Sequence, residues 1–134
     1  MKPAARILQK AVRKLQRCGV SPEALMNKDG AYCAAGVIYS VAGVSDEVLR
    51  RASVVTLNGD VVETQEFEVD GTPQMHAAMK AQRIFAKVIR RAEFGGKYDA
   101  YRSIYGINGI AAFNADHPDL VIPAMKQALK EAQR

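Results

Sequence analysis

Tryptophan is absent from this chain, and cysteine occurs only twice, as Cys18 and Cys33. Two cysteines are too few for a disulfide framework, and these two lack the paired spacing of a zinc site. The sequence therefore predicts neither a bound metal nor another cofactor. Both cysteines are interpreted as reduced thiols that are buried in a core.

Long hydrophobic runs are also absent, and no apolar stretch approaches the roughly 18 residues that a bilayer-spanning helix needs. Cations within residues 6–14 occupy the place where a signal peptide requires an uncharged core. We therefore expect a protein that remains in the cytoplasm and does not enter a membrane.

The composition that is present resembles that of ordinary globular domains, because 49% of the 134 residues are hydrophobic and 25% are charged. A chain of this length buries about two thirds of the surface of its unfolded form, so a substantial core is available. No internal repeat, low-complexity segment or linker divides the chain. We expect residues 1–134 to fold as a single domain without a partner.

The charge is unevenly distributed along the chain. Residues 1–18 lack acidic residues and carry six lysines and arginines, which exceeds the net charge of +5 of the whole chain. Residues 46–70 have the opposite balance, with seven acidic residues against two arginines and a local sum of −5. The molecule is therefore expected to be electrically two-sided.

Two long segments have apolar residues at spacings of three and four, which is typical of amphipathic helices. The first covers residues 3–18, begins with Pro3 and ends at Gly19. The second begins after Thr72, which acts as the cap, and continues to about Phe94. Each helix is expected to have one buried apolar face and one basic face.

Shorter helices are predicted between these two segments. Nearly every residue of 31–42 is apolar, which indicates a central buried helix, and the small residues 34–36 would let another backbone approach closely. Ser45 is expected to cap a further helix that ends near Ala52.

A β-hairpin is predicted from residues 53–57, which are rich in β-branched side chains. Asn58 and Gly59 form the strongest short hairpin signal, and the return strand would run through residues 61–69. A two-stranded hairpin is marginal alone, so it must pack on helices or extend the sheet of a partner. The fold class is thus mainly α (α+β), a compact domain of four to six helices with one hairpin near residues 53–69.

The remaining segments are predicted to be turns and a closing helix. Residues 21–26 are expected to form a short helical turn, residues 106–109 a bend, and residues 114–118 a turn. The last helix is predicted to start near Asp119, with Pro123 in its first turn, where proline displaces no ladder hydrogen bond.

Two motifs resemble those of a known family. Residues 30–36 contain a Cys-x-x-Gly motif, and residues 109–116 contain an aromatic residue followed by Asn and Asp ahead of a helix. Together with the helical start, they resemble an uncharacterised family of small bacteriophage and actinobacterial proteins. This chain departs from the family pattern, with Phe113 where Trp is usual and Ala115 inserted within the second motif. The resemblance implies a compact helical domain and a phage origin, and it implies no activity.

One polar cluster is a candidate for a small-molecule site, because it places a histidine beside an acid. The residues of this possible pocket are Tyr32, Asn108, Asn114, Asp116 and His117. The alternative interpretation is that Asn114, Asp116 or Asp119 accepts hydrogen bonds from the free amides at the start of the last helix.

A nucleophilic cysteine is not favoured. Cys33 would need His76 or His117 as an adjacent base, and its apolar surroundings should raise the thiol pKa. The glycine-rich residues 95–97 and 106–109 neither follow a buried strand nor match a Walker pattern, so they are interpreted as helix stops. No catalytic residue is predicted.

Two basic stripes are the most distinctive features of the sequence. They consist of Arg6, Lys10, Arg13 and Arg17 in the first helix, and of Lys80, Arg83, Lys87 and Arg90 in the helix that follows Thr72. Side by side, the stripes would track phosphates of a nucleic acid, with affinity that falls steeply with salt. Alternatively, each stripe is a solvated helix face, or Glu63, Glu66 and Glu68 lie against one of them. No interleaved aromatic residue or helix-turn-helix signature accompanies the stripes, so contacts to bases are not expected.

The sequence favours a non-enzymatic interaction protein, such as a phage-encoded accessory factor that binds a host protein through a basic helix face or the hairpin edge. One alternative is a nucleic-acid-binding protein that uses both basic stripes. Another is a small-molecule binder or small enzyme with a site near residues 114–117. The opposed charge patches also permit a homo-oligomer.

Overall fold

The computed structural model describes residues 1–22, 24–57, 69–96 and 107–134, and for residues 52–57 and 107–108 it describes the backbone alone. Within these ranges the chain is mainly α-helical and has no β-sheet. The elements in chain order, with η for a 3-10 helix, are α1 (Pro3–Cys18), α2 (Ala34–Ala42), α3 (Asp46–Leu57), α4 (Pro73–Ile89), η2 (Ala92–Phe94), α5 (Ile107–Asp116), η4 (Pro118–Leu120) and α6 (Val121–Ala132). The prediction of a mainly helical chain is confirmed.

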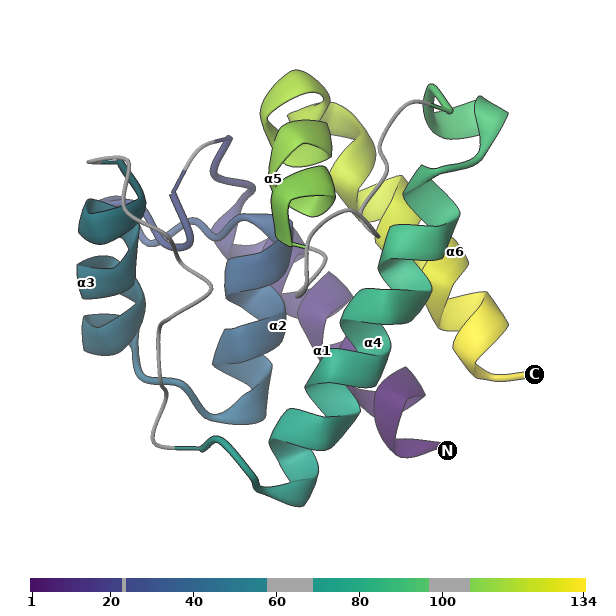
Figure 1. The fold of residues 1–134 in the computed structure, drawn as a ribbon, viewed down its shortest axis with the longest axis horizontal. Helices are drawn as coiled ribbons and strands as arrows, with labels where there is room; N and C mark the ends of the chain where they lie inside the picture. The colour runs from purple at the N-terminus through teal and green to yellow at the C-terminus, as the bar shows by residue number, and fades with distance from the viewer. Residues whose placement is uncertain (23, 58–68, 97–106) are drawn as a thin grey trace.

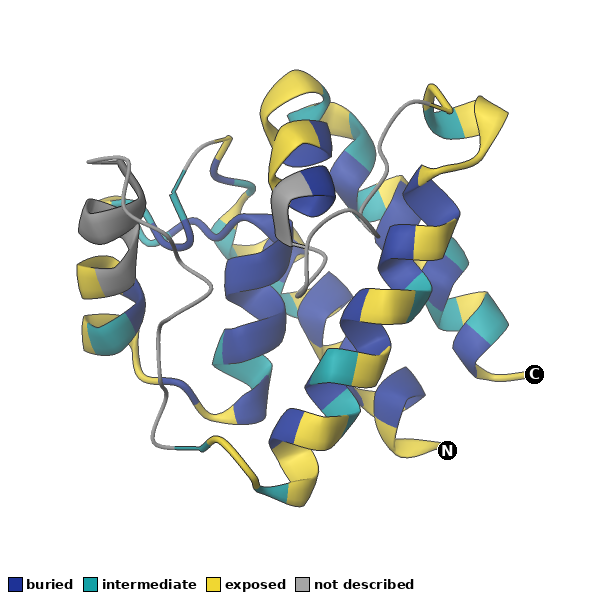
Figure 2. Ribbon diagram, viewed as in Figure 1, coloured by how far each residue is buried: buried dark blue, intermediate teal, exposed yellow. Residues whose placement is uncertain are grey.

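Four helices form the centre of the molecule (Figure 1). α1, α4 and α6 pack against one another, and α2 packs against both α1 and α4. α5 covers one end of this group through contacts with α2 and α4, whereas α3 lies beside α2. Figure 2 shows the buried residues of these helices turned toward the centre. Phe85 of α4 and Phe113 of α5 are fully buried there and meet edge to face, with ring centroids 6.1 Å apart.

Among the described residues, no helix has the length and apolar character that crossing a membrane requires.

α1 has the limits that its sequence predicts. Pro3 occupies its first turn, and the apolar face that includes Leu8 and Leu15 is buried. Gly19 adopts a φ of +90°, and its N–H donates to the Leu15 carbonyl at 2.8 Å. The helix ends here because glycine tolerates this positive φ better than other residues.

α2 starts later than the apolar run predicts, because residues 31–33 are extended and Cys33 is the N-cap. Tyr32 makes isolated bridges with Val20 and Met26 instead of helical hydrogen bonds. The expected close approach of another backbone is confirmed at Gly36, where an added Cβ would lie 1.9 Å from the Leu25 carbonyl oxygen. Burial along the helix is nearly complete, as expected.

The predicted β-hairpin is not supported. α3 is capped as expected, since the Val48 N–H donates to the Ser45 hydroxyl at 3.3 Å, but it continues through residues 53–57, the predicted first strand. β-branched residues reduce helix propensity only slightly, and a helix that has already started continues through them. The turn at residues 58–59 and most of the return strand lie outside the described residues.

Three local predictions near turns are wrong. Residues 21–26 do not form a helical turn in the part described, although the Ala24 N–H donates to the Ser21 hydroxyl at 3.2 Å. The expected bend and turn near residues 106–118 are largely replaced by α5, which starts at Ile107 and ends at Asp116. Gly109 is buried within α5 and does not form the predicted bend.

The last two predicted helices agree with the structure apart from their ends. Thr72 caps α4, as expected, by accepting a hydrogen bond from the Met75 N–H at 3.2 Å. α4 ends at Ile89 instead of near Phe94, because the chain changes to η2 before the glycines at 95–96 stop it. α6 begins just after η4, with Pro123 as its third residue.

Candidate functional site

Asn114 is a buried structural clamp. Its side chain is 1% exposed, its Oδ1 accepts a hydrogen bond from the Ala34 N–H at 2.9 Å, and its Nδ2 donates to the Ser21 carbonyl at 2.6 Å. Asn114 therefore accepts a hydrogen bond from a free amide at the start of a helix, as expected of its residue type, but this helix is α2 and not the last helix.

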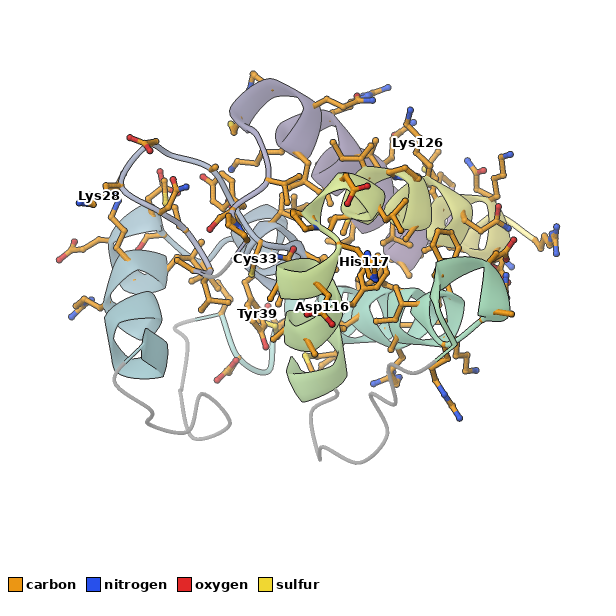
Figure 3. The ribbon with its side chains drawn as sticks, turned by 90° about the horizontal axis from the view of Figure 1, so that it is seen from above. Lys28, Cys33, Tyr39, Asp116, His117 and Lys126 are labelled. Carbon is orange, nitrogen blue, oxygen red and sulfur yellow. The ribbon has the colours of Figure 1, made fainter. Side chains whose placement is uncertain are left out.

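The Ser21 backbone lies between Tyr32 and Asn114, because its N–H donates to the Tyr32 carbonyl at 2.8 Å and its carbonyl accepts from the Asn114 amide. The Tyr32 hydroxyl donates to Asp46 at 2.9 Å, so the side chains of Tyr32 and Asn114 bind different partners, none of which belongs to the predicted set. At the end of α5, Asp116 is exposed and the His117 ring lies 5.9 Å from that of Phe113 (Figure 3). The side chain of Asn108 lies outside the described residues.

Cys33 acts as a helix cap. Its Sγ accepts a hydrogen bond from the Gly36 N–H at 3.3 Å, and its own N–H donates to the Leu25 carbonyl at 3.2 Å. Burial of the Cys33 thiol raises its pKa to about 11, so the thiol stays protonated at neutral pH. A protonated, buried thiol is a poor nucleophile, in agreement with the interpretation drawn from the sequence.

The described residues contain no group of three His, Cys, Asp or Glu side chains that could hold a metal ion.

A cluster around Lys14 was not predicted as a unit. The Lys14 ammonium donates to the Ser40 hydroxyl at 2.6 Å and lies 5.0 Å from the centre of the Tyr32 ring. Burial and the hydrogen bond with Asp46 raise the pKa of Tyr32. These contacts join α1, α2 and the start of α3, so Lys14 stabilises the fold. The sequence signal that separates Lys14 from the other cations of α1 is its position outside the basic stripe formed by Arg6, Lys10, Arg13 and Arg17.

One buried polar side chain also escaped the sequence analysis. Gln82 of α4 is 2% exposed, and neither its Nε2 nor its Oε1 has a hydrogen-bond partner among the described residues. Its position in a stripe of buried residues of α4 is the only sequence signal that could have located it. An unpaired amide of this kind destabilises the fold.

The basic stripe of α1, called the α1 cationic face below, is wholly exposed. It consists of Arg6, Lys10, Arg13 and Arg17. None of these four side chains forms an ion pair with the described part of the chain, in contrast to Arg91, which pairs with Glu131. α1 has no acidic residue in its first turn or elsewhere. The face is therefore a row of cations that the fold leaves to solvent.

The second stripe, called the α4 cationic face, consists of Lys80, Arg83, Lys87 and Arg90, and it too is exposed. Each stripe lies opposite the buried residues of its own helix, so each faces away from the core. Figure 3 shows α1 on one side of the molecule and α4 on the other, with Lys126 of α6 on the α1 side. The two stripes do not form the continuous surface that phosphate tracking by both would need.

A groove lies beside the α1 cationic face, between the first turns of α1, the first turns of α4 and the last turn of α2. Its volume is about 490 Å³. The residues that line it are Met1, Pro3, Arg6, Ile7, Lys10, Val41, Pro73, Gln74 and Ala77. The α1 cationic face contributes two of its members, Arg6 and Lys10, to this groove.

Neither a protein-family model, a curated protein nor a solved structure matches this chain. The resemblance to small phage and actinobacterial proteins stays a prediction.

Proposed function

We propose that this protein is a non-enzymatic interaction module whose α1 cationic face binds an acidic surface of another protein. The observation that carries the proposal is the row of four exposed cations without an ion pair among the described residues. Like charges at positions i and i+4 of a helix repel each other by about 0.2–0.5 kcal/mol per pair. An acidic partner would remove this repulsion and would be attracted from a distance.

The dimensions of the face favour a protein partner over a nucleic acid. Arg17 lies eleven positions after Arg6, so the row is about 16 Å long at 1.5 Å per residue. This length corresponds to three turns of an acidic helix. The α4 cationic face points elsewhere, which deprives a single duplex of the second set of phosphate contacts that tight binding needs.

The proposed role is that of an accessory factor that binds a protein of its host, the role that the sequence itself favours. Binding of this kind needs a surface and no reacting group. The buried cap at Cys33 and the clamp at Asn114 are accordingly parts of the scaffold that holds α1 and α2 in place.

Affinity capture from a host-type lysate with nuclease present tests the proposal. Three tagged forms are compared: the wild type, a variant with Arg13→Glu and Arg17→Glu, and a matched variant with Arg83→Glu and Lys87→Glu. We expect one protein in stoichiometric amount, retained by the wild type and the α4 variant and lost from the α1 variant. Loss of all captured material on nuclease treatment, or equal capture by all three forms, would contradict the proposal.

A further inference from the structure

The groove beside the α1 cationic face has an apolar floor. Ile7 is buried at its base, and Val41 and Ala77 are half-buried where α2 and α4 border it. Both half-buried residues also pack against the hydrophobic core, which fixes the position of the groove floor. At about 490 Å³, the groove is large enough for one or two apolar side chains of a ligand.

The rim of the same groove is positively charged. Arg6 and Lys10 are exposed on one wall, and no acidic residue belongs to the lining. The opposite wall is the start of α4, where Pro73 and Gln74 stand at the positive end of the helix dipole. A ligand that fits must therefore combine an apolar part for the floor with negative charge for the rim.

The spacing of the two cations indicates how those negative charges are arranged. Arg6 and Lys10 are four residues apart on a helix, so their Cα atoms are separated by about 6 Å along the axis. Acidic side chains of a peptide are separated by a similar distance, at positions i and i+4 of a helix or about 6.8 Å apart at i and i+2 of a strand. A small inorganic anion would meet one cation and leave the apolar floor uncovered.

We infer that this groove is the anchor site for an acidic peptide segment of the partner protein. One apolar side chain of the segment rests on Ile7, Val41 and Ala77, and two flanking carboxylates bind Arg6 and Lys10. The inference rests on the proposed function, because it names the part of the partner that the α1 cationic face would receive. Arg13 and Arg17 lie beyond the groove and supply attraction without an anchor.

Fluorescence anisotropy with a labelled synthetic peptide tests the anchor. The probe is a short peptide in which two leucines stand among glutamates, and two control peptides replace the leucines with serine or the glutamates with lysine. We expect binding of the first peptide at low salt, at least about tenfold weaker binding of the serine peptide, and no binding of the lysine peptide.

Variants then locate the binding on the surface. Ala77→Trp and Gln74→Trp fill the groove, and Ala111→Trp is the matched control at an exposed position of α5. Lys10→Glu removes a rim charge, with Lys87→Glu on the α4 cationic face as its control. We expect each groove variant to lose about tenfold in affinity for the leucine-glutamate peptide and each control to bind as the wild type. Circular dichroism verifies that the Ala77→Trp variant is folded. If it is not folded, the Gln74→Trp variant alone tests the groove.

The outcomes separate this inference from the proposed function. Unchanged peptide binding by both tryptophan groove variants overturns the anchor site, even where the Arg13→Glu and Arg17→Glu variant loses its partner in the capture experiment. Tighter binding of a labelled single-stranded oligonucleotide than of the peptide, insensitive to Gln74→Trp, overturns both proposals in favour of phosphate binding.

Discussion

Gly36 of α2 lies directly against the backbone of Leu25, and a Cβ on residue 36 would stand 1.9 Å from the Leu25 carbonyl oxygen. That carbonyl also accepts a hydrogen bond from the Cys33 N–H, so it cannot move away without loss of this contact. The Cys-x-x-Gly motif thus has a structural explanation within this chain. Cys33 caps the helix, and the absence of a side chain at Gly36 leaves room for the Leu25 backbone, to which the Cys33 N–H is bonded.

We predict that Gly36→Ala destabilises the protein by at least about 3 kcal/mol, the upper end of the range for overpacked sites, because a backbone group obstructs the new methyl. Gly30→Ala is the control, since Gly30 has a φ of +84° but open space around its Cβ position. Its cost should be limited to about 1–2 kcal/mol of backbone strain. Urea denaturation measures both values, and equal losses for the two variants would refute the steric explanation.

The Asn114 clamp leads to a second prediction. Asn114→Ala leaves the Ala34 N–H and the Ser21 carbonyl without their side-chain partner inside the protein. Each buried group without a partner costs about 1–3 kcal/mol, so we expect a loss of about 2–6 kcal/mol in the free energy of unfolding. Asp119→Ala, at an exposed position of η4, should change stability by less than about 0.5 kcal/mol. A small effect of Asn114→Ala would mean that water replaces the amide.

The raised pKa of Cys33 predicts a loss of stability in alkali. Its pKa is about 11 in the folded protein against 9.0 for an unperturbed thiol, so the unfolded chain releases the proton first as pH rises. The free energy of unfolding should therefore be unaffected by this group below pH 9 and should fall by about 3 kcal/mol toward pH 11. Cys33→Ser retains a capping atom without this titration and should lack that part of the decline. An identical pH profile for both proteins would show that burial of the thiol does not persist.

Gln82 provides a prediction of opposite sign. Because its buried amide has no hydrogen-bond partner in the part of the chain that the structure describes, Gln82→Leu should stabilise the protein by about 1–3 kcal/mol. Gln16→Leu, at an exposed position of α1, should have an effect within about 0.5 kcal/mol. Thermal and urea unfolding measure the difference. Destabilisation by Gln82→Leu would reveal that this amide has a partner or a role that the fold of the described residues does not explain.

Local sequence patterns were sufficient to predict the helices α1, α4 and α6. Their hydrophobic spacing, and caps such as Thr72 and Gly19, involve residues within one or two turns of each other, so they can be recognised in the sequence alone. The same local reasoning failed at residues 53–57, where β-branched side chains predicted a strand and the structure has the end of α3. The β-strand propensity of a residue is a weak signal, and the helix that precedes residues 53–57 decided between strand and helix.

The sequence by itself determined a mainly helical chain, the limits of α1, the exposed rows of cations and the burial of Cys33, because each follows from composition or from spacing along one helix. Only the tertiary structure decided that Asn114 caps a helix 80 residues away, that the two cationic faces point apart, and that Arg6 and Lys10 border a groove with α4. These relationships join residues that are distant in the chain. Their geometry depends on how the helices pack, which no single segment encodes.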